Sequence, residues 1–172
     1  MGGYDVARLA ELETLSAGML DSAVARYKEA IEADSSFILA YWHLGRIFSW
    51  HGAEDPRPFL YRAAAHARGL DPKNSALIIT DSMAVAVRRS PVPLSRWTTS
   101  WRVLGVLEGA ASRDPGDPQV WYELGEAQYH WGANVTTPDA EASVRAFQRA
   151  IALSRRYPTD PDAPQGMYQV VR

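Results

Sequence analysis

The sequence predicts an all-α protein built from consecutive antiparallel helix pairs. The first observation is that Trp121, Leu124 and Trp131 recur at helical spacing, which places them on one face of a helix. The second is Gly125 on that helix, because a glycine leaves room for a neighbouring helix to approach closely. The third is that the same pattern occurs earlier in the chain, from Tyr41 to Gly52. A repeated helical pattern is typical of helix pairs that stack on one another.

The composition excludes several classes of function. The chain has 172 residues, a net charge of −2 and no cysteine. Proteins that bind nucleic acids usually carry an excess of basic residues, which this chain lacks, so we expect no nucleic-acid partner. Without cysteine, neither a disulfide nor a thiolate metal site can form. No segment is apolar over the length of a membrane span, so no direct membrane insertion is expected. The N-terminal residues do not resemble a signal peptide, so we expect a cytoplasmic protein or one whose compartment the sequence leaves open.

Two helices are expected in the first part of the chain. An apolar stripe predicts one helix over about Tyr4 to Ser16, and Gly18 is expected to end it. A second helix then carries Ala23, Tyr27 and Ala30 on one face. These two helices would form the first antiparallel pair.

The later pairs follow from the same signals. Helices are expected at about 38–52 and 59–69, at 74–89 and 95–113, and at 117–132 followed by a helix from Pro138 past Ala150. The helix at 74–89 has Asp81 and Ser82 where the others have Leu-Gly. It is therefore assigned to the repeat pattern from the units on either side of it and not from its own sequence. Residues 158–172 are expected to be a tail or a short capping helix.

The spacing of these residues resembles that of a known family. The run Trp121-Tyr122-x-Leu124-Gly125, followed by Ser143, Phe147 and Ala150, resembles a tetratricopeptide repeat. The resemblance implies a tetratricopeptide-repeat solenoid of about four antiparallel helix pairs in one domain over 1–172, with an extra C-terminal helix if the tail folds. The implied units are 4–37, 38–74, 75–117 and 118–157. The chain is also similar to the repeat-rich regions of bacterial signalling proteins, which implies sensing or docking.

The distance between matching alanines tests the expected register. Ala30 and Ala67 are 37 residues apart, and Ala110 and Ala150 are 40 apart, whereas the repeat of this family has about 34 residues. We expect the excess in the loops between the two helices of each unit, where insertions cost little.

In this family the first helix of each pair lines a concave surface that holds a peptide of another protein. The matching positions are the predicted partner-binding residues: Leu39, Trp42, Arg46, Trp50, Ile79, Met83, Tyr122, Glu126, Tyr129 and His130. Their aromatic and aliphatic character suits an apolar or amphipathic peptide. Trp42, Tyr122 and Tyr129 fit the core between repeats equally well, and this alternative stays open.

The expected function is a non-catalytic protein–protein interaction scaffold without a metal or another cofactor. The four histidines form no pair at metal-ligand spacing, and no serine stands in a nucleophile motif. The alternative is a structural or accessory subunit that is packed permanently in a larger assembly, which could be membrane-associated. Exposed apolar ends would favour this alternative, because a solenoid normally needs polar caps. The sequence leaves the partner and the oligomeric state open.

Overall fold

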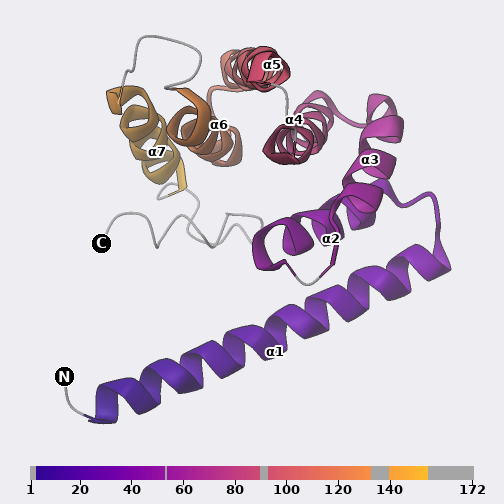
Figure 1. The fold of residues 1–172 in the computed structure, drawn as a ribbon, viewed down its shortest axis with the longest axis vertical. Coiled ribbons are helices and arrows are strands. Elements are labelled where there is room, and N and C mark those ends of the chain that lie inside the picture. The colour runs from indigo at the N-terminus through magenta and orange to yellow at the C-terminus, as the bar shows by residue number, and fades with distance from the viewer. Residues whose placement is uncertain (1–2, 53, 90–92, 133–139, 155–172) are drawn as a thin grey trace. The chain divides into compact units, whose positions relative to one another are not determined.

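The fold was taken from a computed structural model, which describes residues 3–52, 54–89, 93–132 and 140–154 (Figure 1). The helices are α1 (Gly3–Ala33), α2 (Ile38–His51), α3 (Arg57–His66), the short 3-10 helix η1 (Ala67–Gly69), α4 (Pro72–Arg89), α5 (Pro93–Arg113), α6 (Pro118–Trp131) and α7 (Ala140–Ser154). The described residues contain helices and connecting turns but no strand, which confirms the all-α class. The expected cap at residues 137–139 and the expected tail at 158–172 lie outside the described residues.

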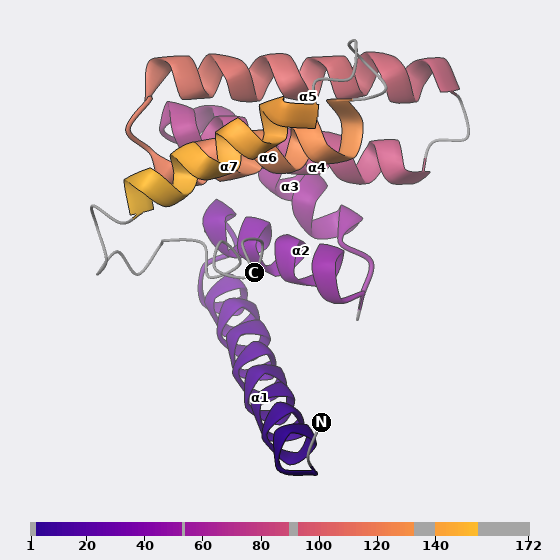
Figure 2. The ribbon, with the colours of Figure 1, turned by 90° about the vertical axis from the view of Figure 1, so that its left-hand side faces the viewer.

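The chain divides between His66 and Ala67 into two compact units, and each is described by itself. In the first unit α2 packs against both α1 and α3. In the second unit each helix from α4 to α7 packs against the next, and α4 also contacts α6. Figure 2 shows α4, α5 and α6 lying side by side along their lengths. The assignment of residues 1–172 to one domain stays a prediction.

The predicted break at Gly18 is wrong. A single helix, α1, covers both segments that were expected to form the first antiparallel pair. A glycine inside a helix costs only about 1 kcal/mol relative to alanine, and no proline lies near Gly18. The capping-type residues Asp21 and Ser22 that follow it lie inside α1. Gly18 has no positive φ angle and lies within the continuous helix α1. The first unit therefore contains one helical hairpin, α2–α3, with α1 packed against α2.

The turns before α2 and α6 have the same backbone hydrogen bonds. The Asp34 amide donates to the Ala30 carbonyl at 2.9 Å, and 80 residues later the Asp114 amide donates to the Ala110 carbonyl at 2.9 Å. Each turn is followed by a 14-residue helix. The similarity between these two parts of the sequence therefore extends to their local structure.

Two glycines lie where the helices of each hairpin approach most closely. A Cβ atom on Gly45 in α2 would lie 2.7 Å from Leu60 Cγ of α3. A Cβ atom on Gly125 in α6 would lie 2.8 Å from ring carbons of Phe147 in α7. Real Cβ atoms do not come so close to other carbons, so a side chain added at either position would force Leu60 or Phe147, or the helix that carries it, to shift. The prediction that Gly125 leaves room for a neighbouring helix is confirmed, and Gly45 does the same in the first hairpin.

These contacts also correct the register of the first hairpin. Leu60 faces Gly45 as Phe147 faces Gly125, so Ala63 corresponds to Ala150, and both alanines are fully buried. The residue matched to Ala150 by counting was Ala67, which is also buried but lies one turn later, in η1. With Ala63 in its place, the interval from Ala30 becomes 33 residues.

Three helices, α3, α4 and α5, begin two residues earlier than expected, in each case with a proline in the first turn. Proline is compatible with a first helical turn because its missing N–H has no partner there. In α3 the proline is Pro58, and Arg57 N–H donates to Asp55 Oδ1 at 3.1 Å. In α4 it is Pro72, where Asp71 stands at the N-cap. The proline of α5 is Pro93.

Candidate partner-binding surfaces

Trp42 and Tyr122 occupy equivalent positions in α2 and α6, and both are buried, with 2% and 8% of their surface exposed. The Tyr122 ring lies 5.7 Å from the Phe147 ring and packs beside Ala150. The Trp42 ring lies 5.3 Å from the Arg46 guanidinium. This burial favours the core interpretation of Trp42 and Tyr122 that their spacing had left open. Their role in partner binding stays a prediction.

Trp50, Tyr129 and His130 lie in the last turns of α2 and α6, and all three are exposed. Trp50 exposes 56% of its surface and Tyr129 exposes 70%. The Tyr129 ring meets the His130 ring edge-on at 5.1 Å, and His130 Nε2 lies 3.5 Å from Glu126 Oε2. The end of α6 thus presents an aromatic ring beside a polar pair, an arrangement that can hold an amphipathic segment.

The other five predicted residues are half-buried. They are Leu39 and Arg46 in α2, Ile79 and Met83 in α4 and Glu126 in α6. In the first unit a contact joins Trp42 with Arg46, and in the second unit contacts join Glu126, Tyr129 and His130.

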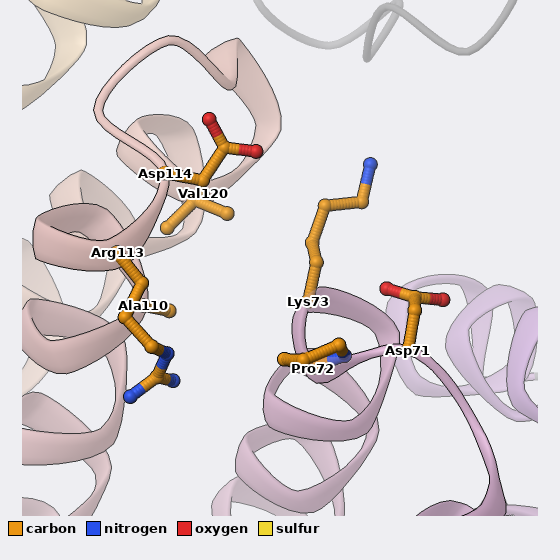
Figure 3. A pocket seen from close by; sticks show the side chains of 7 residues that line it. All are labelled: Asp71, Pro72, Lys73, Ala110, Arg113, Asp114 and Val120. Carbon is orange, nitrogen blue, oxygen red and sulfur yellow. The ribbon is translucent and has the colours of Figure 1, made fainter.

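The second unit also contains a pocket of about 270 Å³ between the start of α4, the end of α5 and the start of α6 (Figure 3). Seven residues line it: Asp71, Pro72, Lys73, Ala110, Arg113, Asp114 and Val120. Buried Ala110 and Val120 provide apolar walls, whereas the charged side chains carry both signs. Ligand pockets usually measure about 300–1,000 Å³, so this one suits a side chain or a small group better than a large cofactor.

Two of the charged groups at this pocket already have partners. Lys73 Nζ lies 3.0 Å from Asp117 Oδ2. Asp71 Oδ1 accepts a hydrogen bond from the Asn74 amide at 3.0 Å, and this bond lowers the pKa of the Asp71 carboxyl. The pocket was not predicted from the sequence, because the residues that line the pocket come from the ends of three helices. The available signal was the Asp-Pro pairs at 71–72 and 114–115, which mark such ends.

Another exposed surface, outside the predicted residues and the pocket, lies on α5. Leu94, Trp97 and Trp101 expose 69%, 47% and 60% of their surface. The opposite side of α5 contributes buried Val103 and Leu107 to the core. The exposed side was not predicted from the sequence. The available signal was the helical spacing of Leu94, Trp97 and Trp101, which lie away from Val103 and Leu107 around the helix.

Comparison with known proteins gives no relative, since no family model matches the chain and no curated protein matches it. Within the described ranges, no group of three or more His, Asp or Glu side chains is arranged to hold a metal ion. No helix in the part of the chain that the structure describes is both long and apolar enough to cross a membrane.

Proposed function

We propose that this chain is a non-catalytic protein-interaction scaffold of the tetratricopeptide-repeat type, which binds a peptide or a partner domain on the concave face that this repeat type implies. The observation that carries the proposal is the exposure of Trp50 and Tyr129 near the ends of the equivalent helices α2 and α6. Tryptophan and tyrosine are enriched among the residues that carry most of the binding energy of protein interfaces.

The repeated local structure supports this proposal. Each of the hairpins α2–α3 and α6–α7 has a glycine where its first helix meets a side chain of its second helix. The turns before α2 and α6 have the same backbone hydrogen bonds. Stacked helical repeats of this kind create extended surfaces that bind other proteins. The match between two hairpins 80 residues apart is therefore the structural argument for a repeat scaffold.

The exposed residues also suggest the chemistry of the partner. Trp50 and Tyr129 offer apolar rings and His130 offers a polar imidazole, and the half-buried Glu126 beside them offers an acidic group. An amphipathic segment would place apolar side chains on the rings and polar ones beside the acidic group. A highly charged tail would gain little from this surface.

Selection of peptides displayed on phage against the full chain would test the proposal. We expect apolar or amphipathic peptides, whose dissociation constants are then measured by fluorescence anisotropy. Trp50→Ala or Tyr129→Ala should weaken binding at least ~10-fold, as expected for a residue that dominates an interface. Tyr61→Ala is the matched control, because Tyr61 is an exposed aromatic residue on α3, outside the predicted surface. Failure to select any peptide, or an equal loss in the control, would contradict the proposal.

The second candidate is a structural or accessory subunit of a larger assembly. The exposed Leu94, Trp97 and Trp101 on α5 favour it, because a permanent interface is more apolar than a transient one. Co-purification of the full-length protein from its own cells would test it. A partner that stays bound through high salt and depends on Trp101, not on Trp50, would favour the subunit over the scaffold.

A further inference from the structure

One line of exposed residues runs along nearly the whole length of α5. Successive members are four, three, four, three and four residues apart, which keeps them within about 40° of one line along the helix. This is also the spacing of the contact seam in a coiled coil. The six residues, called the α5 seam below, are all exposed: Leu94, Thr98, Trp101, Gly105, Glu108 and Ser112.

The packing of the second unit does not explain the α5 seam. In Figures 1 and 2, α5 lies to one side of α4 and α6, so one of its faces points away from both helices. A Cβ atom on Gly105 would meet no atom of the described residues within 4 Å. A glycine inside a helix weakens it, and at Gly105 no close neighbour within the unit requires one.

Two copies of the α5 seam fit each other when the two helices run antiparallel. An antiparallel two-fold contact centred at residue 103 pairs each seam residue with another seam residue of the second copy. Leu94 then meets Ser112, and Trp101 meets Gly105, so a large side chain faces a small one in both layers. The remaining layer pairs Thr98 with Glu108. Every contact occurs twice, as a two-fold axis requires.

We propose that the α5 seam is the contact of a symmetric dimer, in which α5 packs antiparallel against α5 of a second copy of this chain. The indole of Trp101 lies over the bare backbone at Gly105 of the second copy, and this close approach is the reason for a glycine at that place. Trp97 lies beside the seam, where its indole N–H can donate to the Glu108 carboxylate of the second copy.

The pairing of large with small residues favours a second copy over a lipid surface, because a lipid surface has no two-fold pattern for the seam to match. Exposed charges of α5 include Glu108 on the seam and Arg96 and Arg102 away from it, so they are of both signs and do not separate the two occupants. Each copy offers one leucine and two tryptophans that are about half exposed, so the apolar area covered is of the order of several hundred Å². Stable specific interfaces bury about 1,200–2,000 Å² in total, so the α5 seam falls in the smaller class of weak, transient interfaces, and we expect a reversible dimer with a dissociation constant in the micromolar range.

Sedimentation velocity of the full chain over a concentration series would test the dimer. We expect the wild type to pass from monomer to dimer and Gly105→Leu to stay monomeric. The Gly105→Leu monomer should fold normally, because its new side chain meets open space in the unit. Gln148→Leu, at an exposed position of α7, is the matched control and should dimerise as the wild type does. The double variant Trp101→Gly/Gly105→Trp exchanges the large and small positions and should restore the dimer.

Disulfide cross-linking would test the antiparallel register, since the natural chain has no cysteine. Positions 94 and 112 are about 27 Å apart along α5, too far for a bond within one copy. Oxidation of Leu94→Cys/Ser112→Cys should give a covalent dimer linked between these two positions, whereas neither single variant should cross-link.

Three results would overturn the proposal. They are a wild type that stays monomeric up to about 100 µM, a Gly105→Leu variant that dimerises like the wild type, and a Leu94→Cys variant that cross-links to itself. A monomer that binds phosphatidylserine vesicles through Trp101 would identify a lipid surface as the occupant instead.

Discussion

At the residue scale, two glycines determine how closely the paired helices approach. In Gly125→Leu the new Cβ atom would stand 2.8 Å from the Phe147 ring, so the ring or the helix has to move. We expect a loss of about 1–3 kcal/mol in the free energy of unfolding, the usual cost of overpacking. Gly45→Leu should behave in the same way, because the Leu60 backbone nitrogen lies 3.2 Å from the added atom. Urea denaturation measures both changes, and an unaltered stability would show that the hairpins pack differently.

A second residue-scale feature is the side chain of Gln128 in α6. Its Oε1 atom is buried and has no hydrogen-bond partner in the part of the chain that the structure describes. The equivalent residue of α2 is Phe48, which is buried and packs against Phe59 at 5.3 Å. A buried unpaired polar group costs about 1–3 kcal/mol, so Gln128→Leu should raise stability by up to that amount. A lower melting temperature in Gln128→Leu would mean that the amide has a partner, and Gln148→Leu on the exposed side of α7 controls for the substitution itself.

At the scale of the helices, the continuity of α1 leads to opposite predictions for two glycines. Gly18 has a negative φ and open space around it, so Gly18→Ala should stabilise the protein by about 0.5–1 kcal/mol. Gly52 ends α2 with a φ of 70°, where alanine is strained, so Gly52→Ala should destabilise it by about 1 kcal/mol. Thermal unfolding and circular dichroism compare the two. If Gly18→Ala also destabilises, the chain turns at Gly18 after all.

The cap of α4 predicts a dependence on pH. Hydrogen bonds from Asn74 lower the pKa of Asp71 in the folded protein, whereas its pKa in the unfolded chain is about 3.9. The stability that Asp71 contributes is therefore present above about pH 4 and is lost as the pH falls through the lowered pKa. Asp71→Ala should cost about 0.5–2 kcal/mol at pH 7, and the difference from the wild type should shrink in acid. Asp71→Asn can still cap the helix and should lose less at pH 7. A constant difference from pH 7 to pH 2 would exclude this role.

Prediction from the sequence succeeded for the helices where local chemistry and packing agree. Pro118 after Asp117 fixes the start of α6, and the Asp117 carboxylate accepts hydrogen bonds from the amides of Gln119 and Val120. It failed at Gly18, because a single glycine signals a helix end and a weak helix interior equally well. The match of Ala67 to Ala150 was wrong because alanines one turn apart on α3 and η1 are all buried, and only the contact of Leu60 with Gly45 separates them.

The candidate site was less predictable from the sequence than the fold. Helical spacing places Trp42 and Trp50 in one helix, but it does not tell which of them the neighbouring helices cover. Their exposure, 2% and 56%, depends on α1 and α3 and on the side chains those helices bring. The pocket beside Asp71 and the α5 seam also depend on packing between helices, which a motif within one helix does not specify.

At the scale of the whole molecule, the scaffold proposal requires that binding and stability depend on different aromatic residues. Trp42→Ala and Tyr122→Ala remove buried rings, so each should lower the free energy of unfolding by about 3–5 kcal/mol. Trp50→Ala and Tyr129→Ala remove exposed rings and should change it by less than about 0.5 kcal/mol. Urea denaturation of the four variants, each measured on the full chain, gives this comparison.

The outcome bears on how the whole chain works, because a stacked helical protein stabilises itself through one face of each helix and recognises partners through another. If the Trp50→Ala and Tyr129→Ala variants keep their stability and lose peptide binding, the exposed ends of α2 and α6 serve recognition. If they unfold as easily as Trp42→Ala, then Trp50 and Tyr129 are part of the protein's own packing. The partner would then have to bind elsewhere, and the exposed face of α5 would be the next surface to test.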